Sequence, residues 1–406
     1  MYNYLFSLFC RYSIVLSGFI VFIFTSYQFG PEGRGIIAIG GSIISIIGII
    51  FSFNLGRSFI SLAKQNKILK ENLIKSYIKL HLVLIFLAIF VAFIYMFFSN
   101  HLYELSLQNI IFLFLIGIPF YLWGVNNNDI YASFDMTFKQ EVIILSTRIV
   151  LIIVLALLWL LNANQIFIFL LLYYFTLSVG SLVEMIYIYR QGKLKDFSIL
   201  KKYLPLIPKL IKYAHSDYLA FHLYPFFLIL LSTFFLDLKE LGKLNFAIQI
   251  TSFIFLLSIV ASIRMKSYVS MKGTKNYSKN IIILFFITSI LSFFAFVLCI
   301  FLVQDFVNYF FSSFGDIRKY LLILLFSIPG HLLYQFNLPV MLEKNQLKKS
   351  AVINGMNFIF CLFIAFFAIK YYGIYGFCVS FSLFYMLQIP FNFLFLRDNY
   401  KHEIFR

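Results

Sequence analysis

Long apolar runs alternate with short polar segments along the whole chain, and this pattern predicts the fold. A transmembrane helix needs roughly 20 mostly apolar residues. Twelve runs reach this length, so we expect an all-α polytopic membrane protein with about twelve transmembrane helices. The expected spans cover residues 4–27, 35–56, 77–98, 108–128, 142–161, 167–190, 213–236, 243–263, 280–303, 317–340, 351–370 and 373–396.

Basic residues are distributed unequally between the two sides of these spans. The even-numbered loops with their adjoining helix ends, together with the C-terminal tail, carry 24 of the 33 Lys and Arg residues. The odd-numbered loops carry 6. Cytoplasmic loops are enriched in Lys and Arg, so both termini are expected in the cytoplasm.

The second half of the chain repeats features of the first half at a shift of 209 residues. Gly33-Arg34 then meets Gly242-Lys243, and the polar edge RSFIS at 57–61 meets KSYVS at 266–270. Six spans per half is an even number, so we expect two parallel six-helix lobes, as in many transporters. The predicted divisions are a first lobe, a basic cytoplasmic connector, a second lobe and a cytoplasmic tail, at 1–190, 191–212, 213–399 and 400–406.

Composition and charge agree with a membrane protein. Hydrophobic residues make up 62% of the chain and charged residues 12%, against about 25% charged in a soluble domain. The net charge of +17 comes from loop residues, which indicates membrane topology and no nucleic-acid partner. The cysteines lie in apolar runs without a CxxC or Cys/His spacing, so no disulfide framework, metal site or cofactor is indicated.

The segment Gly30-Pro31-Glu32-Gly33-Arg34-Gly35 between the first two spans resembles the turn at this place in Wzx-type oligosaccharide flippases. The segment at 240–244 (ELGKL) resembles its counterpart in the second half, and the segment at 372–376 (YGIYG) is also typical of them. These flippases belong to the multidrug/oligosaccharidyl-lipid/polysaccharide exporter superfamily. The resemblance implies a V-shaped pair of lobes in the inner membrane. By alternating access they would move an oligosaccharide linked to an undecaprenyl-diphosphate-type lipid to the periplasmic leaflet, as in O-antigen biosynthesis.

Charged residues inside membrane spans are costly and often mark a pathway or a site. Arg11 is the eighth residue of the first expected span, about 10 Å from its cytoplasmic end. An arginine there suits a lipid diphosphate, because its planar fork matches phosphate oxygens, although it could also snorkel to the surface. Arg148 and Glu184 have matching expected depths on consecutive spans, so Arg148 could contact substrate or form a structural ion pair with Glu184.

The seventh span begins with a group of titratable residues. His215, Asp217 and His222 lie within seven residues, and the two histidines share a helix face. They are candidates for proton or sodium coupling, with His222 also a candidate for substrate contact, or they are interfacial polar residues at a helix start. Three prolines inside spans are candidate hinges: Pro119, Pro225 and Pro329.

Two alternatives to a flippase stay open. A cation-coupled drug exporter of the same superfamily would be expected to have a carboxylate in its first span, where this chain has Arg11. A membrane O-antigen polymerase or acyltransferase would be expected to have a large external loop or paired loop acids. Here the loop at 304–316 offers only Asp305 and Asp316, and no Walker loop is present, so we expect no enzyme.

Overall fold

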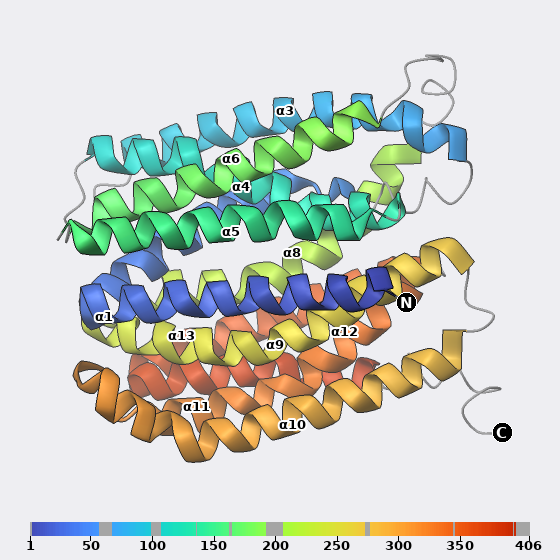
Figure 1. The fold of residues 1–406 in the computed structure, drawn as a ribbon. Coiled ribbons are helices and arrows are strands. Elements are labelled where there is room, and N and C mark those ends of the chain that lie inside the picture. Colours follow the sequence, from blue (N-terminus) through green and yellow to red (C-terminus); the bar gives the residue numbers. More distant parts are fainter. Residues whose placement is uncertain are drawn as a thin grey trace. The chain divides into compact units, whose positions relative to one another are not determined.

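The computed structural model of the chain is almost entirely helical (Figure 1). Its described residues form eleven α-helices and two short 3-10 helices. The structure describes residues 2–56, 67–98, 107–134, 136–161, 165–191, 206–272, 277–343, 346–392 and 394.

Helix α1, Tyr2–Ser52, contains the first two expected spans. Gly30 interrupts it with φ 59° and ψ −165°, and Pro31 follows. A positive φ costs glycine little, and proline has no N–H to leave unsatisfied, so the chain bends here at low cost. The apolar stretch Tyr12–Ser52 has 41 residues, about twice what one bilayer crossing needs.

The other helices of the first half are antiparallel neighbours joined by short connections. Helix α6 packs against α4, α5 and α3, and α3 also packs against α4 (Figure 1). Their bounds are α3 Lys67–Phe98, α4 Leu107–Ser133, α5 Thr137–Leu160 and α6 Ile166–Arg190.

In the second half, α9 packs against α12, α10 and α11. Gly373 breaks α13 with φ 55°, as Gly30 breaks α1, so α13 contains two spans. The bounds are α8 Leu206–Ser232, α9 Leu238–Lys272, α10 Tyr277–Phe310, η1 Ser312–Phe314, α11 Arg318–Leu324, η2 Leu325–Ser327, α12 Ile328–Glu343 and α13 Leu347–Met386.

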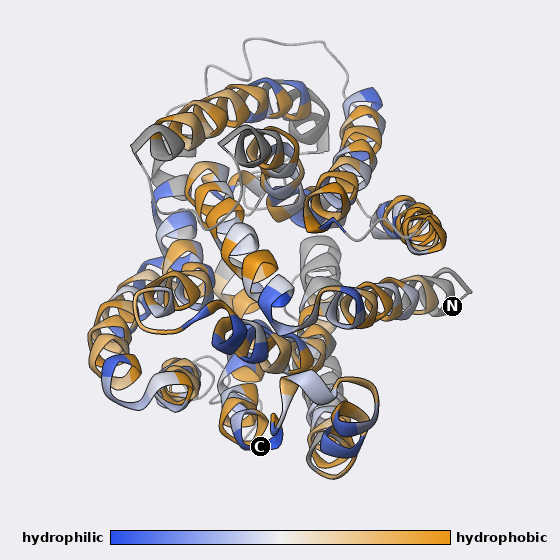
Figure 2. Ribbon diagram, turned by 90° about the vertical axis from the view of Figure 1, so that its left-hand side faces the viewer, coloured by the Kyte–Doolittle hydropathy of each residue, from blue (hydrophilic) through white to orange (hydrophobic). Residues whose placement is uncertain are grey.

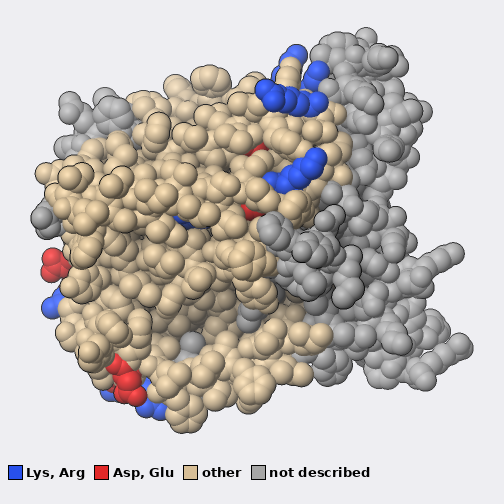
Figure 3. Space-filling view, viewed as in Figure 1, with Lys and Arg blue, Asp and Glu red and all other residues tan. Residues whose placement is uncertain are grey.

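These elements confirm the predicted fold class. Among the described residues, six helices are long and apolar enough to cross a membrane, or seven if the bent α10 is one span, and α1 and α13 are each long enough for two spans. Hydrophobic colouring dominates the helices (Figure 2), and the face drawn in Figure 3 carries few charged side chains. Large apolar side chains on α5 stay exposed, among them Ile153 and Leu157, as lipid-facing residues do. The chain is a multi-pass integral membrane protein.

Equivalent helices in the two halves start at nearly the predicted spacing of 209 residues. The starts of α3 and α10 lie 210 residues apart, those of α4 and α11 lie 211 apart, and those of α5 and α13 lie 210 apart. The turn η2 comes just before Pro329, whereas α4 and α8 run through Pro119 and Pro225 as single helices. The matching boundaries support a repeat, and the roles of these prolines as hinges stay predictions.

The chain forms two compact units. Unit 1 contains residues up to Phe24 and Gly40–Leu219, and unit 2 contains Thr25–Ile39 and the chain from Ala220 onward. The core of unit 2 is rich in aromatic side chains, with the rings of Phe221 and Tyr334 stacked 3.6 Å apart. The predicted divisions near residues 190 and 212 stay predictions.

Candidate functional site

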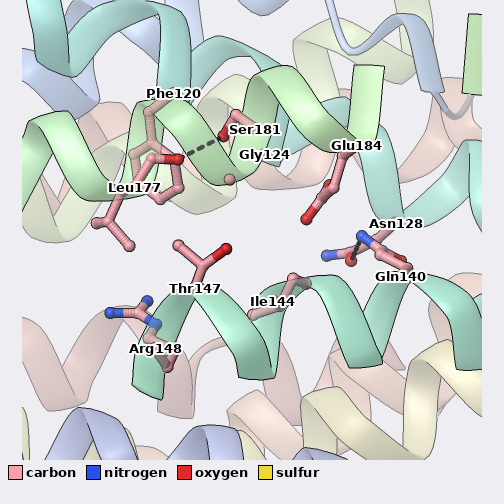
Figure 4. A pocket seen from close by; sticks show the side chains of 11 residues that line it. Phe120, Gly124, Asn128, Gln140, Ile144, Thr147, Arg148, Leu177, Ser181 and Glu184 are labelled. Atoms are coloured by element: carbon pink, nitrogen blue, oxygen red, sulfur yellow. Dashed lines mark hydrogen bonds between the residues drawn. The ribbon is translucent and has the colours of Figure 1, made fainter. Parts of the chain in front are cut away.

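A cavity of about 140 Å³ lies inside unit 1, between α4, α5 and α6 (Figure 4). Its lining combines apolar, small and polar side chains with two charged ones, Arg148 and Glu184, and charged residues between membrane helices are rare. Helix α4 contributes Phe120, Gly124 and Asn128, α5 contributes Gln140, Ile144, Thr147 and Arg148, and α6 contributes Leu177, Gly180, Ser181 and Glu184.

Small residues let the helices approach closely around this cavity. A Cβ on Gly180 would lie 2.4 Å from Oγ1 of Thr147, so only glycine fits where α6 meets α5. Thr147 donates its hydroxyl to the Ile143 carbonyl at 2.9 Å, and Ser181 donates to the Leu177 carbonyl at 3.1 Å. Both hydroxyls are therefore satisfied within their own helices, as expected in a membrane interior.

One end of the cavity is strongly polar. Glu184 is 6% exposed and Gln140 2% exposed, and Nε2 of Gln140 donates to Oδ1 of Asn128 at 2.7 Å. The carboxyl group of Glu184 points toward this amide pair (Figure 4). An acid at this depth needs such partners, because an isolated buried carboxylate is very costly.

Arg148 lies at the other end of the cavity and is half-buried (Figure 4). Its Nε is buried and has no hydrogen-bond partner among the described residues. A guanidinium held in this way is available to an anionic group that enters the space.

Arg148 and Glu184 line one cavity, but among the described residues they do not form the ion pair that was one expectation for them (Figure 4). The reason lies in the start of α5, which begins at Thr137 instead of residue 142. Arg148 is then about 16 Å from that end, whereas Glu184 is about 9 Å from its own end of α6. The α5 side chain beside the Glu184 carboxyl group is instead that of Gln140, about 4–5 Å from the start of the helix.

Asn126, on α4 close to this polar end of the cavity, is hydrogen-bonded to the backbone at the end of the second span. Asn126 Nδ2 donates to the Ser52 carbonyl at 3.1 Å, and its Oδ1 accepts from the backbone N–H of Gly56 at 3.2 Å. The run Asn126-Asn127-Asn128-Asp129 is buried or half-buried in unit 1, and the amide of Asn126 satisfies backbone groups at the end of the second span. The sequence reading missed this run, although four consecutive polar residues at the end of an apolar span were a visible signal.

The candidates on α8 divide between the two units. His215 belongs to unit 1 and stacks on Phe53, with ring centroids 5.1 Å apart, and Asp217 is fully buried in the same unit. His222 is half-buried in unit 2, where the edge of its ring meets its neighbour Phe221. Arg11 lies on α1, and its side chain lies outside the described residues.

Three buried polar side chains were not singled out from the sequence. His81 is fully buried in unit 1, and His331 in unit 2 lies 4.0 Å above the ring of Phe255 and shares a 3.0 Å hydrogen bond with Ser258. Arg34 was counted as a loop cation, yet it is 4% exposed. His81 and His331 lie inside expected spans, so the criterion that selected Arg11, a chargeable side chain within a span, could have found them. Among the described residues, no three His, Cys, Asp or Glu side chains are arranged to hold a metal ion.

No protein-family model and no curated protein matches the sequence. Solved structures with the same fold exist. The chain is similar to a MATE protein in complex with MaL6, with TM-score 0.69 and 12% identity, covering 97% of this chain and 94% of the other. It is similar to an outward-facing multidrug resistance MATE family transporter of the MOP superfamily, with TM-score 0.71 and 13% identity, covering 96% and 94%.

A similar likeness links the chain to the lipid II flippase MurJ in an inward closed conformation. The TM-score is 0.66 and the identity 14%, covering 97% of this chain and 87% of the other. The fold is therefore one that occurs in drug transporters and in a lipid-linked substrate flippase.

Proposed function

We propose that the chain is a flippase that moves a lipid-diphosphate-linked oligosaccharide across the inner membrane by alternating access. One observation carries the proposal. Residues 1–31 contain no acidic residue, and the only charged side chain there is Arg11. A pathway that carries a cationic drug needs a carboxylate, whereas a pathway for a diphosphate needs a fixed cation.

The physical problem for such a substrate is the loss of hydration around its diphosphate. Arginine side chains in a wet cavity replace that hydration, because the guanidinium stays charged and binds two oxygens at once. Arg11 is the leading candidate for this role. Arg148 supports it, since its buried Nε is unsatisfied by described protein groups, and His222 is a third candidate.

The transport cycle needs a source of free energy, and this chain contains no Walker loop for ATP. We propose coupling to H⁺ or Na⁺, with Glu184, Asp217 and His215 as the candidate groups. The charge asymmetry of the loops supports cytoplasmic termini and entry of the substrate from the cytoplasmic leaflet.

The test is complementation of a bacterial strain that lacks its own O-antigen flippase. Expression of this chain is expected to restore surface polysaccharide, and the Gly40→Ala variant should match it, because a Cβ at Gly40 meets no atom within 4 Å. Membrane levels are matched by immunoblot. Failure to restore polysaccharide with any of a panel of lipid-linked repeat units, at wild-type expression, would count against the flippase.

A cation-coupled drug exporter is the second candidate function. The buried carboxyl groups of Asp129, Glu141 and Glu184 in unit 1 favour it, as does the likeness to a multidrug resistance transporter. Expression in a strain without its drug exporters separates the two. Increased resistance to cationic drugs without restored polysaccharide would establish the exporter instead.

A further inference from the structure

A histidine with no hydrogen-bond partner lies in the interior of unit 1. His81 on α3 is 0% exposed, and neither of its ring nitrogens has a partner among the described residues. Its ring stacks on Tyr77 at 6.1 Å and meets the edge of Trp123 at 5.2 Å. Buried polar groups are nearly always satisfied, and inside a membrane an unsatisfied one costs several kcal/mol. The exception at His81 therefore points to a role for this imidazole other than structural hydrogen bonding.

Trp123 connects this histidine to the polar end of the cavity. Its indole N–H is buried and has no standard hydrogen bond, and the indole lies beside the carboxyl group of Glu184. The side chain of Gln140, on α5, contacts the same carboxyl group of Glu184. The series His81, Trp123 and Glu184 thus runs through three helices, and it ends at a cavity wide enough for water.

Glu184 has no cationic partner among the described residues. An ionised carboxylate there would depend on neutral donors alone, which offset only part of its desolvation. Uptake of a proton removes the charge, and loss of that proton restores an acceptor for the indole N–H.

We propose that His81, Trp123 and Glu184 form a proton-binding site inside unit 1, with the cavity beside Glu184 as its route to water. This proposal rests on the proposed transport function, and it makes the proton the coupling ion. A sodium ion does not suit the space between His81 and Glu184, because hard cations take several oxygen ligands and the groups there are aromatic rings and an N–H. Beside Glu184, where Gln140 and Asn128 also offer oxygens, the test below separates the proton from sodium. A proton from water binds a Glu184 oxygen, and the reverse step releases it.

Other titratable groups lie around the site, and two of the lysines among them contact aromatic rings. The ammonium group of Lys139 lies 5.4 Å above the ring of Tyr187, and that of Lys75 lies 5.1 Å above the ring of Tyr189. Lys79 is exposed on α3. The remaining groups near the site are Tyr77 on α3, Asp129 and Tyr131 on α4, and Glu141 on α5.

The chain offers its own reporter, because it contains two tryptophans. Trp159 lies near the other end of α5 and is 56% exposed, so Trp159→Phe leaves Trp123 as the sole tryptophan, which is excited at a wavelength where tyrosine does not absorb. Purified Trp159→Phe protein in lipid nanodiscs is titrated between about pH 5 and about pH 8, the range in which histidine and tuned carboxyl groups change charge. We expect one sigmoidal change in Trp123 emission.

Variants assign that change to its groups. In the Trp159→Phe background, Glu184→Gln should abolish it and His81→Gln should shift its midpoint. The matched control is His331→Gln, which alters an equally buried histidine of unit 2 and should leave the midpoint unchanged. Size-exclusion profiles and thermal melts confirm that each variant is folded.

Three results would overturn the site. One is Trp123 emission that does not change with pH in the Trp159→Phe protein. Emission that titrates in both Glu184→Gln and His81→Gln with the same midpoint as in the Trp159→Phe protein would overturn it equally. The third is a change in emission when NaCl replaces choline chloride at fixed pH, which would assign the site to sodium. The measurement needs no transported substrate, so its failure is distinct from failure of the polysaccharide complementation.

Discussion

Gly242 at the start of α9 lies against the backbone of Pro31, so closely that a Cβ on Gly242 would be 1.6 Å from the Pro31 carbonyl oxygen. A second close approach lies beside it, because a Cβ on Gly35 would be 2.2 Å from the Leu238 carbonyl oxygen. The expected repeat relates Gly33 to Gly242, so these contacts join segments equivalent in the two halves. Both segments belong to unit 2.

Gly242→Ala should therefore destabilise the protein strongly. The methyl group meets backbone that cannot rotate away, and overpacking of this kind costs about 1–3 kcal/mol or more. The measurement is the thermal midpoint of the purified protein in detergent. Gly40→Ala serves as the control, because its methyl group meets open space and alanine is favoured over glycine in a helix by about 0.5–1 kcal/mol. Equal midpoints for the two variants would contradict this contact.

Arg34 holds the same region together by hydrogen bonds. Its Nη1 donates to Thr25 Oγ1 at 2.9 Å and its Nη2 donates to Asn245 Oδ1, both within unit 2. Arg34→Ala removes both charge-assisted hydrogen bonds from these buried oxygens, which should cost about 1–3 kcal/mol. Arg318→Ala removes an exposed arginine of the same unit and should change the thermal midpoint little. An equal effect of the two substitutions would show that Arg34 has no such role.

The absence of an ion pair between Arg148 and Glu184 gives a double-mutant prediction. Residues that line one cavity deviate from additivity by about 0.5–3 kcal/mol, so the sign of the change in the double variant is the diagnostic observation. Without an ion pair, the variant Arg148→Ala/Glu184→Ala should be less stable than Glu184→Ala alone in chemical or thermal unfolding. A double variant that is more stable than Glu184→Ala alone would reveal the ion pair. Loss of transport in Arg148→Ala at wild-type stability would support a substrate contact.

The sequence predicted the helices well because the bilayer imposes a length and a composition on each span. It misplaced the start of α5, because four of the five residues at 137–141 (TFKQE) are polar and the continuous hydrophobic signal begins only at residue 142. The whole segment is helical, Thr137, Gln140 and Glu141 are buried, and Gln140 takes the place beside Glu184 that was expected for Arg148. The burial of Arg34 and His81 depends on which helices become neighbours, and hydropathy along the chain carries no such information.

The basic connector at 191–212 provides a topology test. Its six lysines, with the enrichment of Lys and Arg in the other even-numbered loops, predict a cytoplasmic location. A single cysteine introduced in this segment should react with an impermeant maleimide only after the cells are permeabilised. A cysteine introduced at Asp305, in an odd-numbered loop, is the control and should react in intact cells. Labelling of the connector in intact cells would reverse the proposed orientation.

Arg11 is the residue on which the proposed substrate depends most. It cannot lose its proton inside a protein, and an arginine deep in a span costs about 2.5–3.5 kcal/mol on insertion scales. Such a residue is expected to be retained for function. Arg11→Ala should leave the protein inserted but abolish or strongly reduce surface polysaccharide in the complemented flippase-null strain.

The series of substitutions at this position separates charge from geometry. Arg11→Lys should keep partial function, since the charge stays while the bidentate fork is lost. Arg11→Glu should be at least as damaging as alanine, because a carboxylate repels the diphosphate. Polysaccharide display is compared at protein levels matched by immunoblot. If Arg11→Glu displays wild-type polysaccharide, Arg11 has no part in binding the anionic lipid, and the argument for a diphosphate substrate must rest on Arg148 and His222.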